Sequence, residues 1–284
     1  MSLPGLAAMK AAGEKVVVVT AYDYPGALAA EAAGVDVVLV GDSGAMTVLG
    51  HESTVGVTVE EMLVLAGAVR RGLRTPLLVA DLPFGSYETS DEQAVTTAVR
   101  FVKEAGADAV KLEGGGTMSV SRVRAIVAAG IPVMGHVGLT PQTATALGGY
   151  KAQGRTAAAA RRVADEARAL QEAGCFSIVF EAIPSQVAEA IMPWLEAVVI
   201  GIGAGPGTDG QVLVLHDLLG MSSGGSARFV KTYDDLATRM ADGVRRYADD
   251  VRAGTYPGPE HGYAIDPAEL AAFVADPTRN VPAE

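Results

Sequence analysis

The chain has 284 residues, a net charge of −11, 49% hydrophobic residues and one cysteine, Cys175. The acidic balance and the lack of basic runs argue against nucleic-acid binding, and no stretch reaches the ~18 consecutive apolar residues of a membrane span. The N-terminus does not resemble a signal peptide, and a lone cysteine is consistent with a reducing compartment. We therefore expect a soluble cytoplasmic protein without nucleic-acid or membrane partners.

Short apolar runs alternate with longer amphipathic stretches along the chain. In chain order, the runs predict eight strands, at residues 15–23, 35–43, 76–83, 108–115, 131–138, 176–184, 197–205 and 227–235. The stretches predict helices at residues 24–33, 59–72, 91–105, 119–129, 156–173, 185–192 and 235–253. A short helical segment precedes the first strand, and residues 209–220, "DGQVLVLHDLLG", are a weaker helix candidate.

Near-continuous apolar strands separated by helices indicate a parallel sheet that is covered on its outer side. Eight such units over roughly 250 residues favour an α/β fold with a single (β/α)8 TIM barrel. An open doubly wound sheet is the alternative, because the pattern alone does not show closure. No Pro-, Ser- or Gly-rich linker divides the chain, so we predict one domain over residues 1–284, with a C-terminal tail from about residue 254.

The segment "DAVKLEGGG" (108–116) places two charges in an apolar strand. Lys111 and Glu113 are two residues apart, so both side chains point to the same face. A buried charge is costly unless it is paired or bound to a metal. The other predicted strands also become polar only at their carboxyl ends, with Tyr22, Asp23, Asp42, Ser43, Asp81, His136, Glu181 and Lys231. Active sites of barrels lie at that end.

Three carboxylates, Asp42, Asp81 and Glu113, end neighbouring strands. They would repel one another unless a cation lay among them, and oxygen ligands suit Mg²⁺ or another hard divalent ion. Asp42 or Asp81 alone could instead be a local cap. Lys111 could neutralise Glu113 or bind an anionic substrate.

Two further residues are candidates for proton chemistry. Glu181 ends the sixth strand across the mouth, where it could pair with Lys111 or act as a general base. His136 ends the fifth strand and could be a core histidine or donate a hydrogen bond to a substrate oxygen.

The segment "GPGTDG" (205–210) matches the dinucleotide-binding pattern G-x-G-x-x-G. That fingerprint needs a following helix and further βαβ units, normally near the start of a domain. Pro206 interrupts the match and little sheet remains downstream. We expect a tight backbone turn at the mouth, near the substrate, instead of a dinucleotide site.

Nine segments in family order resemble the ketopantoate hydroxymethyltransferase family, also called 3-methyl-2-oxobutanoate hydroxymethyltransferase, from about Leu3 to Ile265. They are "TAYDYPGA", "LVGDSGAMTVLGHEST", "VADLPFGSY", "AVKLEGG", "IPVMGHVGLTPQ", "GGYKAQGR", "FEAIP", "IGIGAGPGTDGQVLVLHDLLG" and "RFVKTY". The resemblance implies a (β/α)8 barrel that transfers a one-carbon unit from 5,10-methylenetetrahydrofolate to 3-methyl-2-oxobutanoate. The product would be 2-dehydropantoate, in pantothenate biosynthesis.

The resemblance also implies roles for individual residues. One Mg²⁺ per subunit would be bound by Asp42, Asp81 and Glu113. The 2-oxo acid would contact Asp42, Ser43, Asp81 and Lys111, and Glu181 would be the general base. Members are usually homodecamers, so a homo-oligomer is expected. The chain departs from the family pattern at Gly44, Ala45 and Thr208, and reads "EAIP" for "ECVP"; none of these positions is an implied ligand.

Two alternatives stay open. The first is another Mg-dependent enolate-forming barrel, of the phosphoenolpyruvate mutase/isocitrate lyase type. Such enzymes usually carry a reactive cysteine in a loop, whereas Cys175 opens a strand. The second is an inactive barrel that only binds a small acid, which would be expected to lack metal ligands, although all three carboxylates are present.

Overall fold

The computed structural model describes residues 1–222 and 227–275. Its backbone contacts divide the chain into two compact units, Met1–Asp234 and Asp235–Glu284. The expectation of one domain with a tail from about residue 254 stays a prediction.

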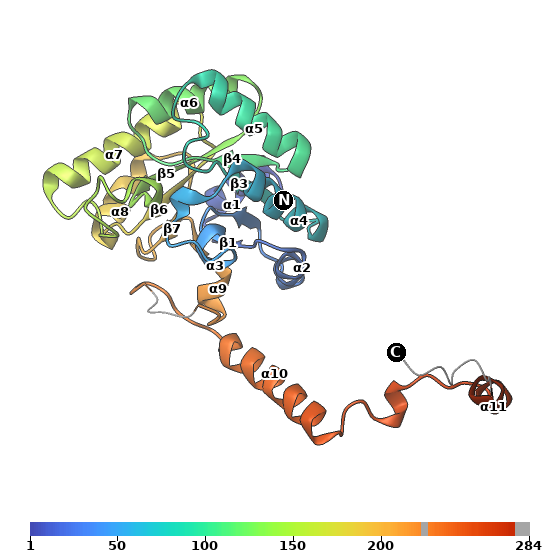
Figure 1. Ribbon diagram of the computed structural model, residues 1–284. Coiled ribbons are helices and arrows are strands. Elements are labelled where there is room, and N and C mark those ends of the chain that lie inside the picture. The colour runs from blue at the N-terminus through green and yellow to red at the C-terminus, as the bar shows by residue number, and fades with distance from the viewer. Residues whose placement is uncertain (223–226, 276–284) are drawn as a thin grey trace. The chain divides into compact units, whose positions relative to one another are not determined.

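The first unit is a closed barrel of eight parallel strands in sequence order, which confirms the predicted TIM barrel (Figure 1). Each strand pairs with its neighbours, and β8 pairs with β1 to close the ring. The strands are β1 (Val16–Thr20), β2 (Val37–Val40), β3 (Leu77–Asp81), β4 (Ala109–Lys111), β5 (Val133–Gly138), β6 (Ser177–Glu181), β7 (Val198–Ile202) and β8 (Gly210–Leu213).

Helices surround this ring. The longer ones in the first unit are α1 (Leu3–Ala12), α2 (Tyr24–Ala33), α4 (Val59–Gly72), α5 (Asp91–Ala105), α6 (Thr117–Ala128), α7 (Ala157–Glu172) and α8 (Ser185–Ile191). Short turns of helix are α3 (Gly44–Thr47), α9 (Leu215–Leu218), η1 (Thr54–Gly56), η2 (Pro141–Thr143) and η3 (Met192–Trp194). The second unit holds α10 (Leu236–Ala253), η4 (Pro259–His261) and α11 (Pro267–Ala275). None of the described helices is long and apolar enough to cross a membrane.

The helix ends follow the sequence signals closely. Ser90 caps α5 by accepting a hydrogen bond from the Gln93 N–H, and Thr58 forms a capping box with Glu61 in α4. At the other ends, Gly34 and Gly106 adopt φ values of 69° and 71°, in the left-handed region that favours glycine. These caps explain why the predicted bounds of α2, α4 and α5 agree with the structure.

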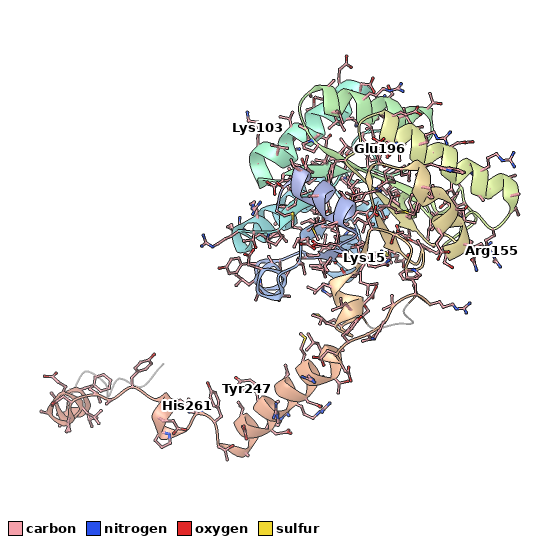
Figure 2. The ribbon with its side chains drawn as sticks, turned by 180° about the vertical axis from the view of Figure 1, so that it is seen from behind. Lys15, Lys103, Arg155, Glu196, Tyr247 and His261 are labelled. Carbon is pink, nitrogen blue, oxygen red and sulfur yellow. The ribbon has the colours of Figure 1, made fainter. Side chains whose placement is uncertain are left out.

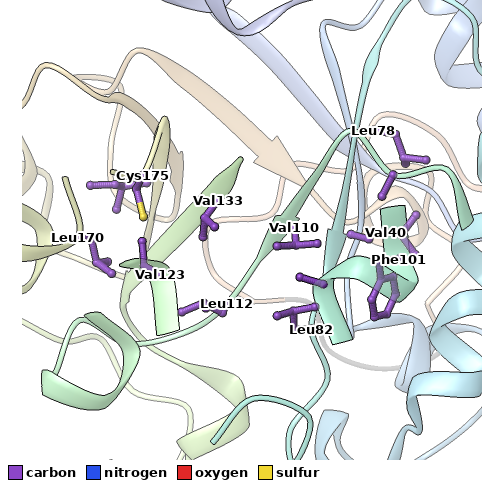
Figure 3. Close-up of a cluster of buried hydrophobic side chains, with 14 of the residues drawn as sticks. Val40, Leu78, Leu82, Phe101, Val110, Leu112, Val123, Val133, Leu170 and Cys175 are labelled. Atoms are coloured by element: carbon purple, nitrogen blue, oxygen red, sulfur yellow. The ribbon is translucent and has the colours of Figure 1, made fainter. Parts of the chain in front are cut away.

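The strands separate two hydrophobic cores. The inner core fills the barrel and includes Val79 and Ala109, while the outer core lies between the strands and the helices and includes Val110 and Leu112 (Figure 3). Because side chains alternate along a strand, Lys111 lies on the same face as Ala109 and points into the barrel. The adjacent pairs Val79↔Ala109 and Asp81↔Lys111 set two charged side chains side by side at the carboxyl end.

Helix α1 covers the amino-terminal end of the barrel. Leu6 belongs to the inner core, and Lys10 Nζ donates to the carbonyls of Leu195 and Ala197 and to Asp209 Oδ2. All three partners lie close to the start of β7 or β8. With this end closed, the carboxyl ends of the strands form the mouth of the barrel.

The prediction of the eighth strand at residues 227–235 was wrong. The strand that closes the ring is Gly210–Leu213, inside the segment read as a weak helix, and Lys231 lies outside the barrel sheet. Gly210 is required there because a Cβ would lie 2.3 Å from the Val16 carbonyl oxygen. The apolar run continues into α9, so the sequence pattern of "VLVLHDLL" does not distinguish a short strand from a helix.

The glycine-rich segment 205–210 also differs from the expectation. It is part of the connection from β7 to β8, which contains no helix, so the dinucleotide reading is excluded. Its last residues reach the amino-terminal end of the barrel, where Asp209 Oδ2 accepts from the Val199 N–H at 2.8 Å and from Lys10 Nζ. Only the start of the segment lies near the mouth, because the chain must return to the opposite end before a parallel strand can begin.

Candidate active site

The carboxyl ends of the strands surround a cavity of about 200 Å³. Seven residues singled out from the sequence line it together: Asp42, Ser43, Asp81, Lys111, Glu113, His136 and Glu181. Five of them are buried, Ser43 is partly buried, and Glu181 has a side chain that is 16% exposed. The structure therefore brings all of the predicted site residues into one pocket.

Lys111 and Asp81 form a buried ion pair at the floor of this pocket. Lys111 Nζ lies 2.5 Å from Asp81 Oδ1, and the Asp42 N–H donates to Asp81 Oδ2 at 3.1 Å. Burial lowers the pKa of Lys111, but the charges of Asp81, Glu113 and Asp42 outweigh it and raise the pKa. Lys111 is thus held as a cation inside the barrel. Its ion-pair partner is Asp81, whereas the sequence suggested Glu113.

Asp42 shows that the pocket carries an excess of negative charge. Burial, followed by the charges of Asp81 and Glu113, raises the pKa of Asp42 to about 8, although Lys111 and a hydrogen bond from Gln142 oppose the rise. A carboxyl with this pKa keeps its proton at neutral pH unless a cation stabilises the charged form. The reading of Asp42 as an isolated cap does not explain this environment, and no side-chain cap is made at the start of α3.

His136 connects two of the carboxylates. Its Nδ1 lies 3.3 Å from Glu113 Oε1 and its Nε2 lies 3.3 Å from Glu181 Oε2, without good hydrogen-bond geometry at either nitrogen. Burial and Lys111 lower the pKa of His136, but the two glutamates outweigh them and raise it to about 9. His136 is therefore a buried cation between Glu113 and Glu181, and Glu181 pairs with it instead of with Lys111.

Ser43 directly precedes α3 and follows Asp42 in the chain. Its Oγ is 2.7 Å from the hydroxyl oxygen of Tyr22, a residue that follows the end of β1. Burial raises the pKa of Tyr22 to about 12, so the phenol stays neutral and can exchange a hydrogen bond with Ser43. The Tyr22 ring packs where a Cβ at Gly44 would lie, 2.7 Å from its Cδ1.

Gln142 and Tyr87 form hydrogen bonds behind the acidic residues of the pocket, and both were missed from the sequence. The Gln142 backbone N–H donates to Glu113 Oε2 at 3.0 Å, and its Nε2 donates to Asp42 Oδ2 at 2.9 Å. Tyr87 donates its hydroxyl proton to Gln142 Oε1 at 2.5 Å while accepting from the Glu113 N–H at 3.4 Å. This arrangement directs the amide NH₂ toward Asp42. The only signal was the place of Gln142 in "GLTPQ", in the loop that follows the end of β5 at Gly138.

Replacing Gln142 with leucine should weaken divalent-cation binding by about tenfold, because partners that orient metal ligands typically contribute that much. The variant loses the donor to Asp42 but keeps the backbone N–H to Glu113. Calorimetric titration with Mg²⁺ or Mn²⁺ measures the dissociation constant directly. Gln171→Leu is the matched control, since Gln171 Oε1 accepts from the Glu196 and Ala197 N–H groups, away from the mouth. Equal affinities in both variants and the unaltered protein would contradict a role for Gln142.

The carboxylates fit a hard cation by their chemistry, although the described residues hold no ready-made cluster of three metal-binding side chains. Oxygens of Asp81 and Asp42 are occupied by Lys111 and Gln142. Oxygen donors, deep burial and the excess charge that raises the pKa of Asp42 all favour a divalent ion over a neutral ligand.

A family model described as ketopantoate hydroxymethyltransferase matches residues 1–259. The chain belongs to the ketopantoate hydroxymethyltransferase family. It is 53% identical over 263 residues to 3-methyl-2-oxobutanoate hydroxymethyltransferase of Moorella thermoacetica, covering 93% of this chain and 97% of that protein. It is 50% identical to the mitochondrial 3-methyl-2-oxobutanoate hydroxymethyltransferase 1 of Arabidopsis thaliana, covering 93% and 78%. The chain is therefore an enzyme of the hydroxymethyltransferase class, as predicted.

Solved structures with the same fold are more distant in sequence. Phosphonopyruvate hydrolase in complex with oxalate and Mg²⁺ superposes with a TM-score of 0.59 at 15% identity, covering 96% of both chains. A 2,3-dimethylmalate lyase of the phosphoenolpyruvate mutase/isocitrate lyase superfamily gives 0.58 at 15% identity, covering 96% and 94%. These likenesses show a shared barrel fold. Cys175, the one cysteine, is buried in front of β6 with a pKa raised by burial to about 12, so it is not placed as a reactive loop thiol.

Proposed function

We propose that this enzyme uses 5,10-methylenetetrahydrofolate and a divalent cation, Mg²⁺, to hydroxymethylate 3-methyl-2-oxobutanoate. The product is 2-dehydropantoate, a precursor in pantothenate biosynthesis. The observation that carries the proposal is the buried pocket in which Lys111 and three carboxylates meet, in a member of this family. The same relationship supports one cation per subunit and a cytoplasmic homodecamer as further proposals.

Asp42, Asp81 and Glu113 would hold the cation. When bound, it supplies Lewis-acid stabilisation of the negative charge that develops on the keto oxygen. Lys111, kept charged by its neighbours, offsets charge on the substrate carboxylate, and Ser43 can donate its hydroxyl proton to the same group. His136 can donate to a substrate oxygen. These residues together orient a small anionic 2-oxo acid at the mouth of the barrel.

Glu181 is placed to remove the proton from C3 of the substrate. It faces the cavity from the end of β6, across from Asp42, and only His136 is its ion-pair partner among the described residues. The carbanion equivalent formed at C3 would then form a carbon–carbon bond with the one-carbon unit. Water supplies the oxygen of the new hydroxyl group, and the bonds from that carbon to the folate nitrogens break, which releases tetrahydrofolate. Apolar side chains in the cavity wall, Val179, Ile202 and Val212, suit the two methyl groups on C3.

The proposal is tested by proton NMR of 3-methyl-2-oxobutanoate in D₂O with the protein and Mg²⁺, first without folate. Loss of the C3 proton signal with Mg²⁺, and no loss in a parallel sample that contains EDTA, would support metal-dependent enolisation. Addition of methylenetetrahydrofolate should then produce 2-dehydropantoate. Absence of both the exchange and the product would overturn the proposed reaction and favour a barrel that only binds small acids.

A further inference from the structure

A second cavity, of about 730 Å³, borders the candidate active site. Its wall contains the backbone stretch that follows Glu181, from Ala182 to Gln186, together with Arg155, Arg228 and Phe229. Its volume lies within the range of pockets that bind small organic ligands, which is about 300–1,000 Å³. Arg155 is at the surface of the barrel unit (Figure 2).

The charge of this cavity is unbalanced. Arg155 and Arg228 line it without any acidic side chain, and neither has an ion-pair partner within residues 1–222 and 227–275. The cavity between α6 and α7 differs, because there Arg161 and Arg162 are accompanied by Asp165 and Glu166. Two unpaired guanidinium groups in a chain with a net charge of −11 indicate an anionic ligand, since arginine binds carboxylates through paired hydrogen bonds.

The two cavities meet at Phe229, which lines both. Its ring packs on the backbone of Gly203, where a Cβ would lie 2.5 Å from the ring. Ala182 adopts φ 50°, a left-handed conformation that no other non-glycine residue in the described chain shares. Its carbonyl accepts from the Gln153 N–H at 2.9 Å, which ties the segment bearing Arg155 to the end of β6. A ligand in the second cavity therefore lies beside the proposed base, Glu181.

The sequence points to the same residues. Arg155 ends the segment "GGYKAQGR" and Arg228 begins "RFVKTY", two segments to which no catalytic or metal-binding role is assigned. Both come from loops at the mouth, far apart in the sequence, and the fold brings them to one cavity.

We propose that Arg155 and Arg228 bind the carboxylates of the glutamate moiety of the one-carbon donor, with Phe229 packing against its aromatic part. This inference rests on the proposed function, because that function requires a folate beside the 2-oxo acid. The donor's reactive carbon would face Glu181 and the 2-oxo acid, while its anionic tail extends into the second cavity. Guanidinium groups there hold the tail without adding positive charge to the metal-binding carboxylates.

The double variant Arg155→Gln/Arg228→Gln tests the proposal. The KM for methylenetetrahydrofolate should rise by about tenfold or more, because loss of about 1.4 kcal/mol of binding corresponds to one decade. C3 proton exchange of the 2-oxo acid, in which the donor takes no part, should remain measurable and reports a folded active site. Arg124→Gln is the matched control, since Arg124 is an exposed arginine of α6 outside both cavities. A donor KM equal to that of the control would overturn the proposal.

A donor that lacks the glutamate, 5,10-methylenetetrahydropteroate, distinguishes the loss of arginine–carboxylate contacts from a general disturbance of the donor-binding site. The unaltered protein should prefer the glutamate-bearing donor by about tenfold, and the double variant should lose most of this preference. Calorimetric titration with tetrahydrofolate measures binding without catalysis. Normal tetrahydrofolate affinity in the double variant would reject the arginine site, whereas missing C3 exchange in the unaltered protein would reject the proposed function instead.

Discussion

Glu181→Gln should lower the rate of C3 proton exchange by at least about 100-fold, since general bases contribute roughly 10²- to 10⁴-fold. The amide has nearly the same shape but accepts a proton far less readily. Binding of the cation and of the 2-oxo acid should persist, because Asp42 follows β2 and Asp81 and Lys111 end β3 and β4, away from β6. NMR in D₂O measures the exchange, and calorimetry measures both binding equilibria.

Glu172→Gln provides the matched control for that experiment, because Glu172 is an exposed glutamate at the end of α7. It should exchange the C3 proton at the rate of the unaltered protein. Rapid exchange in Glu181→Gln would move the base to another group.

Asp81→Ala should remove cation binding and activity together, and it should also destabilise the fold. Lys111 would keep its charge in a buried site without its nearest partner, and breaking such a pair typically costs about 3–5 kcal/mol. Denaturant unfolding measures the stability, and titration with Mn²⁺ measures the metal site. Asp81→Asn keeps the side-chain volume, so it tests cation binding if the alanine variant folds poorly.

A surface ion pair provides the comparison for the loss of stability expected in Asp81→Ala. Arg122 and Asp91 also lie 2.5 Å apart, but the Asp91 side chain is 48% exposed. Asp91→Ala should therefore lower the free energy of unfolding much less than Asp81→Ala does, and it should leave cation binding unchanged. A similar loss in both variants would show that burial does not amplify the Lys111–Asp81 pair. Full activity of Asp81→Asn with the usual Mg²⁺ response would exclude Asp81 as a required ligand.

The site residues could be predicted because the sequence interrupts apolar strands with charge. Lys111 and Glu113 stand two residues apart in a buried strand, where only pairing or ligand binding compensates for their burial. The parallel arrangement then brings the end of each strand to one mouth, so Asp42, Asp81 and Glu181 follow from the fold class. Gln142 and Tyr87 could not be found this way, because neither interrupts a strand and their contacts join loops far apart in the chain.

The sequence by itself determined the longer helices, seven of the strands and their arrangement as a covered parallel sheet, because these depend on local periodicity, capping residues and glycine at helix ends. It did not determine β8 or the closure of the ring, since closure depends on hydrogen bonds to β1 and β7 that no local pattern records. Tertiary structure also decided the charge partners: Lys111 pairs with Asp81, and His136 lies between Glu113 and Glu181. The physical reason is that electrostatic energy depends on distance and burial, and both arise only when separate strands meet.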